Sequence, residues 1–192
     1  MRKWILLLLL LLLPALPVRA QSGALTVDLS PYRDVPIHLY AVAEQDEQGN
    51  FTFTQPFAGC GVELSDPSAQ TMTYAAGTLA VWALEKEIPP TMIRTTDAQG
   101  RAIFESLRQG VYLVTAEPFR RGMQVITPNP FLVYLPTLDG EKTAHWFLTA
   151  QMKCTVQTDD ETSPNTGTAP LAGMALLLSG AALFLLRNRE KT

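Results

Sequence analysis

Short runs of alternating apolar and polar residues fill the middle of this 192-residue chain, and turn-forming residues separate them. Alternation with a period of two gives a strand one apolar and one polar face. Such runs, rich in β-branched and aromatic residues, predict strands over 23–29, 36–43, 51–54, 91–96, 101–107, 111–117, 122–127, 130–135 and 142–157. Short strands at roughly ten-residue spacing with glycine turns predict a mainly β chain folded as a β-sandwich.

One segment has a different period. Between Thr71 and Glu87 the apolar residues recur at helical spacing, after a polar entry at 65–70, and Pro89 and Pro90 then force a stop. The sequence therefore predicts one amphipathic helix inserted among the strands. Further along, Pro128, Pro130 and Pro136 bound the seventh and eighth strands, which favours edge positions for both.

The N-terminus has the three-part layout of a secretory signal peptide. Arg2 and Lys3 precede an apolar run over Ile5–Leu13, and Val18 and Ala20 supply small residues for cleavage after Ala20. Since a bilayer span needs about 20 residues, this run is too short to cross a membrane. The alternative is an uncleaved N-terminal anchor. We interpret 1–20 as a signal peptide and 21–157 as the folded domain.

The C-terminus has a second ordered layout. An acidic stalk with the pentapeptide Ser163-Pro164-Asn165-Thr166-Gly167 occupies 158–167, and a hydrophobic segment with a basic tail occupies 168–192. Its apolar run, Leu171–Leu186, spans a bilayer only marginally, and the basic residues after it favour a cytoplasmic end. A plain tail-anchor helix is one interpretation of this C-terminal hydrophobic segment.

The Pro-x-Thr-Gly order before the apolar run resembles the sorting signal of sortase substrates. The usual pentapeptide begins with Leu, where this chain has Ser163, so the sortase class stays open. The resemblance implies that a transpeptidase cysteine cleaves between Thr166 and Gly167. Pro164 disfavours helix at the preceding residue, which presents the segment extended.

The net charge of the expected mature chain argues against a nucleic-acid partner. Residues 21–166 carry nine Lys and Arg against 17 Asp and Glu, a net charge of −8. Nucleic-acid binding depends on a basic surface that neutralises phosphates. We therefore expect no basic patch and no nucleic-acid partner.

The central segments resemble a known family when taken in order. Its pattern Gly-x-Ala-x-Phe, then Leu, then Gly-x-Tyr falls on Gly100, Ala102, Phe104, Leu107, Gly110 and Tyr112. This order is similar to that of Cna-type B domains, the prealbumin-like sandwiches of Gram-positive pilins. Segments 35–43, 49–52 and 127–136 are similar to the N-terminal domain of such pilins. The resemblance implies a prealbumin-like or Ig-like β-sandwich over roughly 23–157.

Many domains of this family carry an isopeptide bond between a Lys on the first strand and an Asn or Asp on the last. The first two predicted strands contain no Lys, and 142–157 contains neither Asn nor Asp. Glu117 lies five residues after Tyr112, where the family's glutamate lies four after, so the spacing indicates a solvated strand-end residue. We expect no isopeptide of the usual kind.

Three other residues are candidates for covalent links. Cys60 and Cys154 are the only cysteines, and an extracellular compartment permits a disulfide between them. The alternative is two unpaired core residues. The pilin resemblance implies a subunit-linking lysine near Lys153, although the usual Tyr-Pro-Lys context is absent, and a solvated strand lysine is the alternative.

The sequence offers little for catalysis. His38 and His145 both fall in strand patterns, no nucleophile, phosphate-loop or zinc motif occurs, and the two cysteines lack zinc spacing. We expect no enzyme, no cofactor and no metal site.

Together these features predict a cell-wall-anchored, pilin-like surface protein of a Gram-positive-type bacterium, acting as a pilus base, minor pilin or small adhesin. Its expected partners are a sortase, a peptidoglycan precursor or other pilin subunits, and the membrane before processing. The alternative is an extracellular binding module that its C-terminal anchor retains in the membrane. A wall-bound enzyme is a third interpretation.

Overall fold

The computed structural model of the chain describes residues 22–158 except 47, 66–67 and 141–142. Strands dominate this part, together with one α-helix, α2 (Ala69–Glu85), and a 3₁₀ helix, η1 (Gln55–Phe57). The strands are β1 (Gly23–Asp28), β2 (Pro36–Gln45), β3 (Phe51–Phe53), β4 (Met92–Thr95), β5 (Arg101–Leu107), β6 (Gly110–Ala116), β7 (Phe119–Arg121), β8 (Gln124–Pro128), β9 (Phe131–Leu135), β10 (Thr137–Leu138), β11 (Ala144–His145), β12 (Phe147–Gln151) and β13 (Cys154–Thr158). The predicted mainly β fold with one inserted helix is confirmed.

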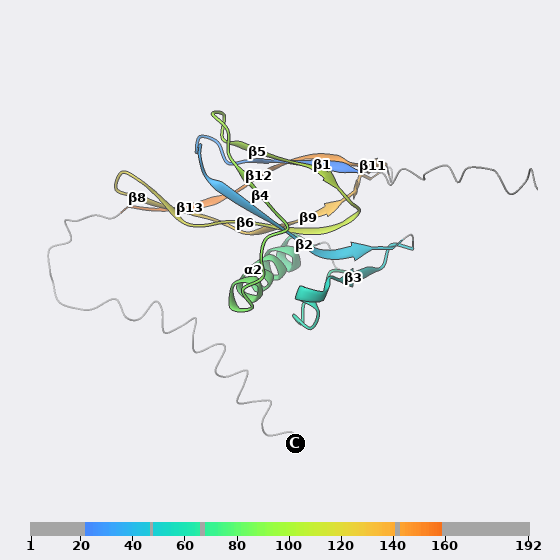
Figure 1. Cartoon of the computed structure of the whole chain (residues 1–192). Helices are drawn as coiled ribbons and strands as arrows, with labels where there is room; N and C mark the ends of the chain where they lie inside the picture. Colours follow the sequence, from blue (N-terminus) through green and yellow to red (C-terminus); the bar gives the residue numbers. More distant parts are fainter. Residues whose placement is uncertain (1–21, 47, 66–67, 141–142, 159–192) are drawn as a thin grey trace, which may run out of the picture. The chain divides into compact units, whose positions relative to one another are not determined.

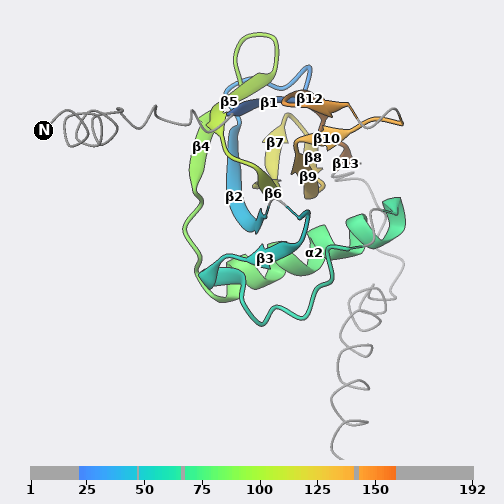
Figure 2. The same ribbon diagram turned by 90° about the vertical axis from the view of Figure 1, so that its right-hand side faces the viewer.

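Two sheets pack face to face, and α2 covers the outer face of one of them (Figures 1 and 2). The small sheet has the order β12-β1-β5, and the large sheet has the order β3-β2-β6-β9 with β4 beside β2. In the small sheet β1 lies between a parallel partner, β12, and an antiparallel partner, β5. A three-stranded sheet, β13-β8-β7, and the pair β10–β11 complete the described part.

This arrangement creates two apolar cores, one on each face of the large sheet. The sandwich core lies between the sheets and is centred on Leu25, Phe104 and Leu39. The helix core lies under α2 and includes Phe57 and Leu79. Strand β6 serves both cores, because its successive side chains point to opposite faces. Its residues from Gly110 to Val114 are therefore all buried, as a central strand covered on both sides requires.

The ends of α2 follow from local chemistry. The Ser68 side chain accepts a hydrogen bond from the Thr71 backbone N–H at 3.4 Å, which caps the N-terminus. The helix ends at Glu85, two residues before the predicted end, because Glu87 adopts a left-handed φ of 51°. Prolines at 89 and 90 then prevent any continuation.

The predicted last strand, 142–157, is divided in the structure. β12 pairs with β1, whereas β13 belongs to the sheet with β7 and β8, so the chain changes sheets between them. Met152 at the crossing is 4% exposed, and its N–H donates to the Asp28 carbonyl at 2.8 Å. A buried apolar side chain therefore divides one periodic run into two strands with different partners.

The proline prediction is half right. β9 is an edge strand of the large sheet, as expected, but β8 lies between β13 and β7 and is not an edge. Pro128 is the last residue of β8, where the missing N–H interrupts little pairing.

Two glycines of the family-like pattern are required by close backbone approach. A Cβ at Gly110 would lie 2.4 Å from the Ala43 carbonyl oxygen, at a register shift between β2 and β6. A Cβ at Gly100 would lie 2.8 Å from the Ser30 Cα, and Gly100 also has a φ of +82°. Only glycine fits such positions without movement of the backbone.

Candidate functional site

The predicted export and anchoring segments at the two ends of the chain lie outside the described residues. This holds for the signal peptide, for the sorting pentapeptide Ser163–Gly167 and for the C-terminal hydrophobic segment. Within 22–158, apart from the gaps, no helix is long and apolar enough to cross a membrane.

Lys153 lies where the chain crosses from β12 to β13, and it is exposed. Its backbone is held in place, because its carbonyl accepts the Asn129 N–H at 2.8 Å. The Asn129 side chain in turn accepts from the Thr155 hydroxyl at 3.4 Å. Between buried Met152 and half-buried Cys154, Lys153 is thus an accessible amine on a positioned segment of backbone.

The two cysteines lie in different cores of the structure. Cys60 and Cys154 are both free cysteines. Cys60 belongs to the helix core, whereas Cys154 packs against the sandwich core, so the large sheet lies between them. Burial raises the pKa of the Cys154 thiol, which keeps it protonated and lowers its reactivity.

Apolar side chains meet where the first strand, β1, pairs with β12, which forms part of the predicted last strand. β1 and β12 lie side by side, with Leu25 opposite Leu148 and Val27 opposite Ala150. Leu25 and Val27 are fully buried in the sandwich core. Glu117, just beyond β6, is exposed, which confirms the prediction of a solvated strand-end residue.

The two histidines have structural surroundings. The His145 Nε2 lies 2.9 Å from the Asp139 Oδ2 at the β10–β11 pair, and both side chains are partly exposed. His38 is half-buried on β2, opposite Thr115 of β6. Within the part of the chain that the structure describes, no group of three or more His, Cys, Asp or Glu is placed to hold a metal ion.

A wide groove lies between the edge strands β9 and β12, and its size is not visible in the sequence. It has a volume of about 790 Å³, and its lining is largely apolar. The large sheet, α2 and the small sheet all contribute to it, with residues that include Phe51, Met72, Tyr134 and Leu148. The Tyr134 hydroxyl donates to the Leu64 carbonyl at 3.1 Å, which fixes one wall. The groove lining combines many apolar side chains with a few polar ones, as in a ligand or peptide site.

A comparison with protein-family models finds no match for this chain, and a comparison with curated proteins finds none either. Solved structures of Gram-positive pilins do match. The full-length major pilin SpaD of Corynebacterium diphtheriae is 18% identical with a TM-score of 0.45, over 70% of this chain and 30% of that protein. The T6 backbone pilin of serotype M6 Streptococcus pyogenes is 19% identical with a TM-score of 0.46, over 70% of this chain and 29% of that protein.

A minor pilin is also similar. GBS52 of Streptococcus agalactiae is 14% identical with a TM-score of 0.32, over 77% of this chain and 48% of that protein. The chain thus spans about a third of the length of the SpaD and T6 pilins and about half of the minor pilin.

Proposed function

We propose that this chain is a pilin-like surface protein that a sortase joins covalently, through Thr166, to the cell wall or to other pilin subunits. The observation that carries the proposal is the order of segments: an export signal, one β-sandwich, a Pro-x-Thr-Gly pentapeptide, an apolar run and a basic tail. Export and membrane retention deliver the pentapeptide to the outer face of the membrane, where sortases act.

The proposed reaction has two steps. A sortase cysteine attacks the Thr166 carbonyl carbon, the bond to Gly167 breaks, and the Gly167 amine leaves with a proton. A second amine then attacks the resulting thioester, so that an amide forms and the cysteine is released as a thiol. Thr166 is therefore a substrate residue. The roles that suit one sandwich next to such a signal are pilus base, minor pilin or small adhesin.

Mass spectrometry of the C-terminus tests this proposal. In the native host we expect the mature protein to end at Thr166, joined to a wall or pilin amine. A variant that lacks 163–167 but keeps the apolar run and basic tail should remain almost entirely in the membrane fraction, because the scissile bond is gone. Native protein that retains Leu171–Leu186 would instead support a tail-anchored binding module.

The groove between β9 and β12 favours that second function specifically, since a volume of about 790 Å³ is ample for a ligand or sugar chain. The two functions differ in the covalent state of the C-terminus and not in the fold. The same mass measurement therefore separates them.

Lys153 is the proposed amine if the subunit polymerises. Replacing Lys153 by Ala should abolish the high-mass ladders on a denaturing gel, because the side chain is exposed and has no part in the cores. Lys86 just beyond α2 is the matched control, since it is also exposed and Lys86→Ala makes the same change of charge. If ladders persist unchanged in Lys153→Ala, another amine links the subunits.

A further inference from the structure

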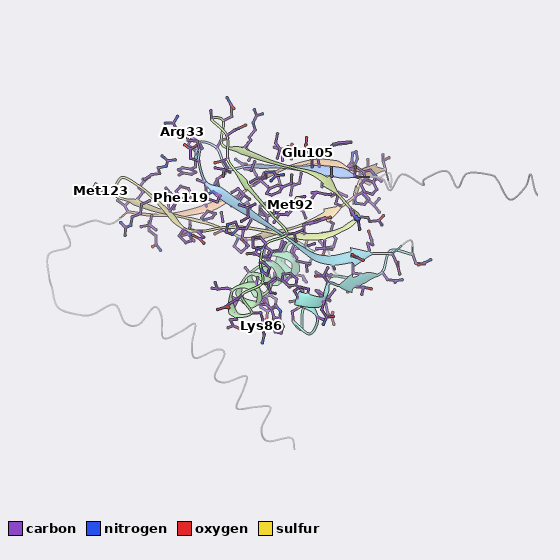
Figure 3. The ribbon with its side chains drawn as sticks, in the orientation of Figure 1. Arg33, Lys86, Met92, Glu105, Phe119 and Met123 are labelled. Carbon is purple, nitrogen blue, oxygen red and sulfur yellow. The ribbon has the colours of Figure 1, made fainter. Side chains whose placement is uncertain are left out.

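A cavity of about 450 Å³ lies at one end of the domain and gathers three arginines. Arg33 comes from the loop between β1 and β2, whereas Arg120 and Arg121 come from β7. The side chains of Arg33 and Phe119, which both line the cavity, are labelled at the same end of the molecule in Figure 3. Arg33 is 87 residues before Arg120 in the sequence, so the sequence does not predict that it joins the Arg120–Arg121 pair.

The concentration of positive charge is unusual for this chain. Residues 21–166 have a net charge of −8, and residues 22–158 contain six arginines outside the gaps, of which half line this cavity. The lining therefore combines three arginines with two carboxylates, a local excess of positive charge on an otherwise acidic chain. His38 lines the cavity as well, and Asp34 and Glu117 are its two acidic residues.

The walls of the cavity are held by hydrogen bonds and ring contacts. The Arg121 Nη2 donates to the Arg33 carbonyl at 2.8 Å, which joins β7 to the loop. The Tyr32 and Phe119 rings meet edge to face, with centroids 5.2 Å apart. Beneath the loop, the buried Thr96 hydroxyl donates to the Tyr32 carbonyl and accepts from the Val35 N–H, each at 3.0 Å. A binding site whose walls are already ordered loses little entropy when its ligand arrives.

The acidic residues leave room for an incoming anion. Arg33 Nε lies 3.8 Å from Asp34 Oδ2, and the two side chains are 66% and 82% exposed. An ion pair that is so exposed contributes little, so a ligand can displace it. Asp34 also adopts a left-handed φ of 61°, a conformation that is uncommon outside glycine and often marks a functional loop.

We propose that this cavity binds a phosphate group outside the cell. Guanidinium groups donate pairs of parallel hydrogen bonds to phosphate oxygens, and the cavity brings such groups together from two separate elements. The phosphate is supplied either by free inorganic phosphate or by the phosphodiester of an anionic cell-surface polymer. The site is independent of the sorting signal, so its failure would leave the proposed covalent anchoring untouched.

Titration calorimetry on the full-length protein in detergent micelles tests the site. The probes are inorganic phosphate and a defined poly(glycerol phosphate) chain, each compared with acetate at the same ionic strength. We expect saturable binding of at least one phosphate probe in the millimolar range or below, and none of acetate. Binding of inorganic phosphate alone identifies the free ion as the source, whereas tighter binding of the polymer identifies the phosphodiester.

Matched variants locate the binding. Arg33→Gln and Arg120→Gln should each weaken it about ten-fold, the loss expected for one charge-assisted contact. Arg108→Gln makes the same charge change in the β5–β6 turn, outside the cavity, and should leave affinity unchanged. Melting curves without ligand show whether each variant folds. If Arg33→Gln does not fold, the affinity of Arg120→Gln alone tests the proposal. Equal weakening by Arg108→Gln, or no saturable binding of either phosphate probe, would overturn the proposal.

Discussion

Replacing Phe104 by Ala is expected to lower the free energy of unfolding by about 3–5 kcal/mol, the range for emptying a large aromatic site in a core. Phe104 on β5 is fully buried and lies opposite Leu25 of β1. Its ring fills the sandwich core, where the small and large sheets meet. Because the surrounding strands are tied into two sheets by backbone hydrogen bonds, they cannot collapse into the space that the ring leaves.

Ile103→Ala is the control for this prediction. Ile103 is the preceding residue on β5, but its side chain points to the outer face and is 49% exposed. We expect it to cost less than about 1 kcal/mol, since only part of its apolar surface leaves water on folding. Urea unfolding followed by circular dichroism measures both variants. Equal losses would mean that the sheets do not pack through Phe104.

Thr96→Val is the second change with a large expected effect, about 2–3 kcal/mol of unfolding free energy. Thr96 is 2% exposed, and it is the one polar residue among the buried residues that the structure describes. Valine has nearly the same shape, so packing is retained. The Val35 N–H and the Tyr32 carbonyl, however, both lose their bond to the hydroxyl, and an unsatisfied buried group costs more than a hydrogen bond normally contributes.

The neighbouring residue supplies the control. Thr95 is the last residue of β4 and is exposed, so Thr95→Val should leave the unfolding midpoint nearly unchanged. Thermal and urea unfolding of the two variants, compared at equal protein concentration, make the test. If Thr96→Val is as stable as the parent chain, then the loop over 29–35 is not held by this hydroxyl.

The Thr96 result also bears on the arginine cavity. The bonds to the Thr96 hydroxyl position the loop that carries Arg33, whereas the backbone hydrogen bond from the Thr96 N–H to the Val35 carbonyl remains in the variant. We therefore expect the fold to survive while the cavity wall loosens. Stability and phosphate affinity are measured separately, so the two roles of this residue can be distinguished.

Local sequence patterns predict most of the elements of this protein. The strand 101–107 agrees with β5 residue for residue, and the strands at 36–43, 51–54 and 130–135 agree with β2, β3 and β9 to within one or two residues at each end. Ala102, Phe104 and Tyr112, which lie in the predicted strands 101–107 and 111–117, are all buried. Such features depend on residues near one another in the chain, because backbone geometry sets the periods.

The remaining features depend on partners far away in the sequence. The run over 142–157 has one period, yet β12 and β13 join different sheets because Met152 is buried where they meet. The sequence leaves open whether the two cysteines pair. In the structure both are free, and the large sheet lies between the cores that hold them.

By itself, the sequence determined the mainly β composition, the α-helix inserted among the strands, the glycine turns and the order of segments at both ends, since each depends on neighbouring residues. Only the tertiary structure decided which sheet each strand enters, that β6 is covered on both faces, and that Arg33 meets Arg120 and Arg121 at one cavity. The physical reason is that side-chain periodicity is a local property of the backbone. Sheet pairing and charge clustering instead depend on which distant surfaces bury together.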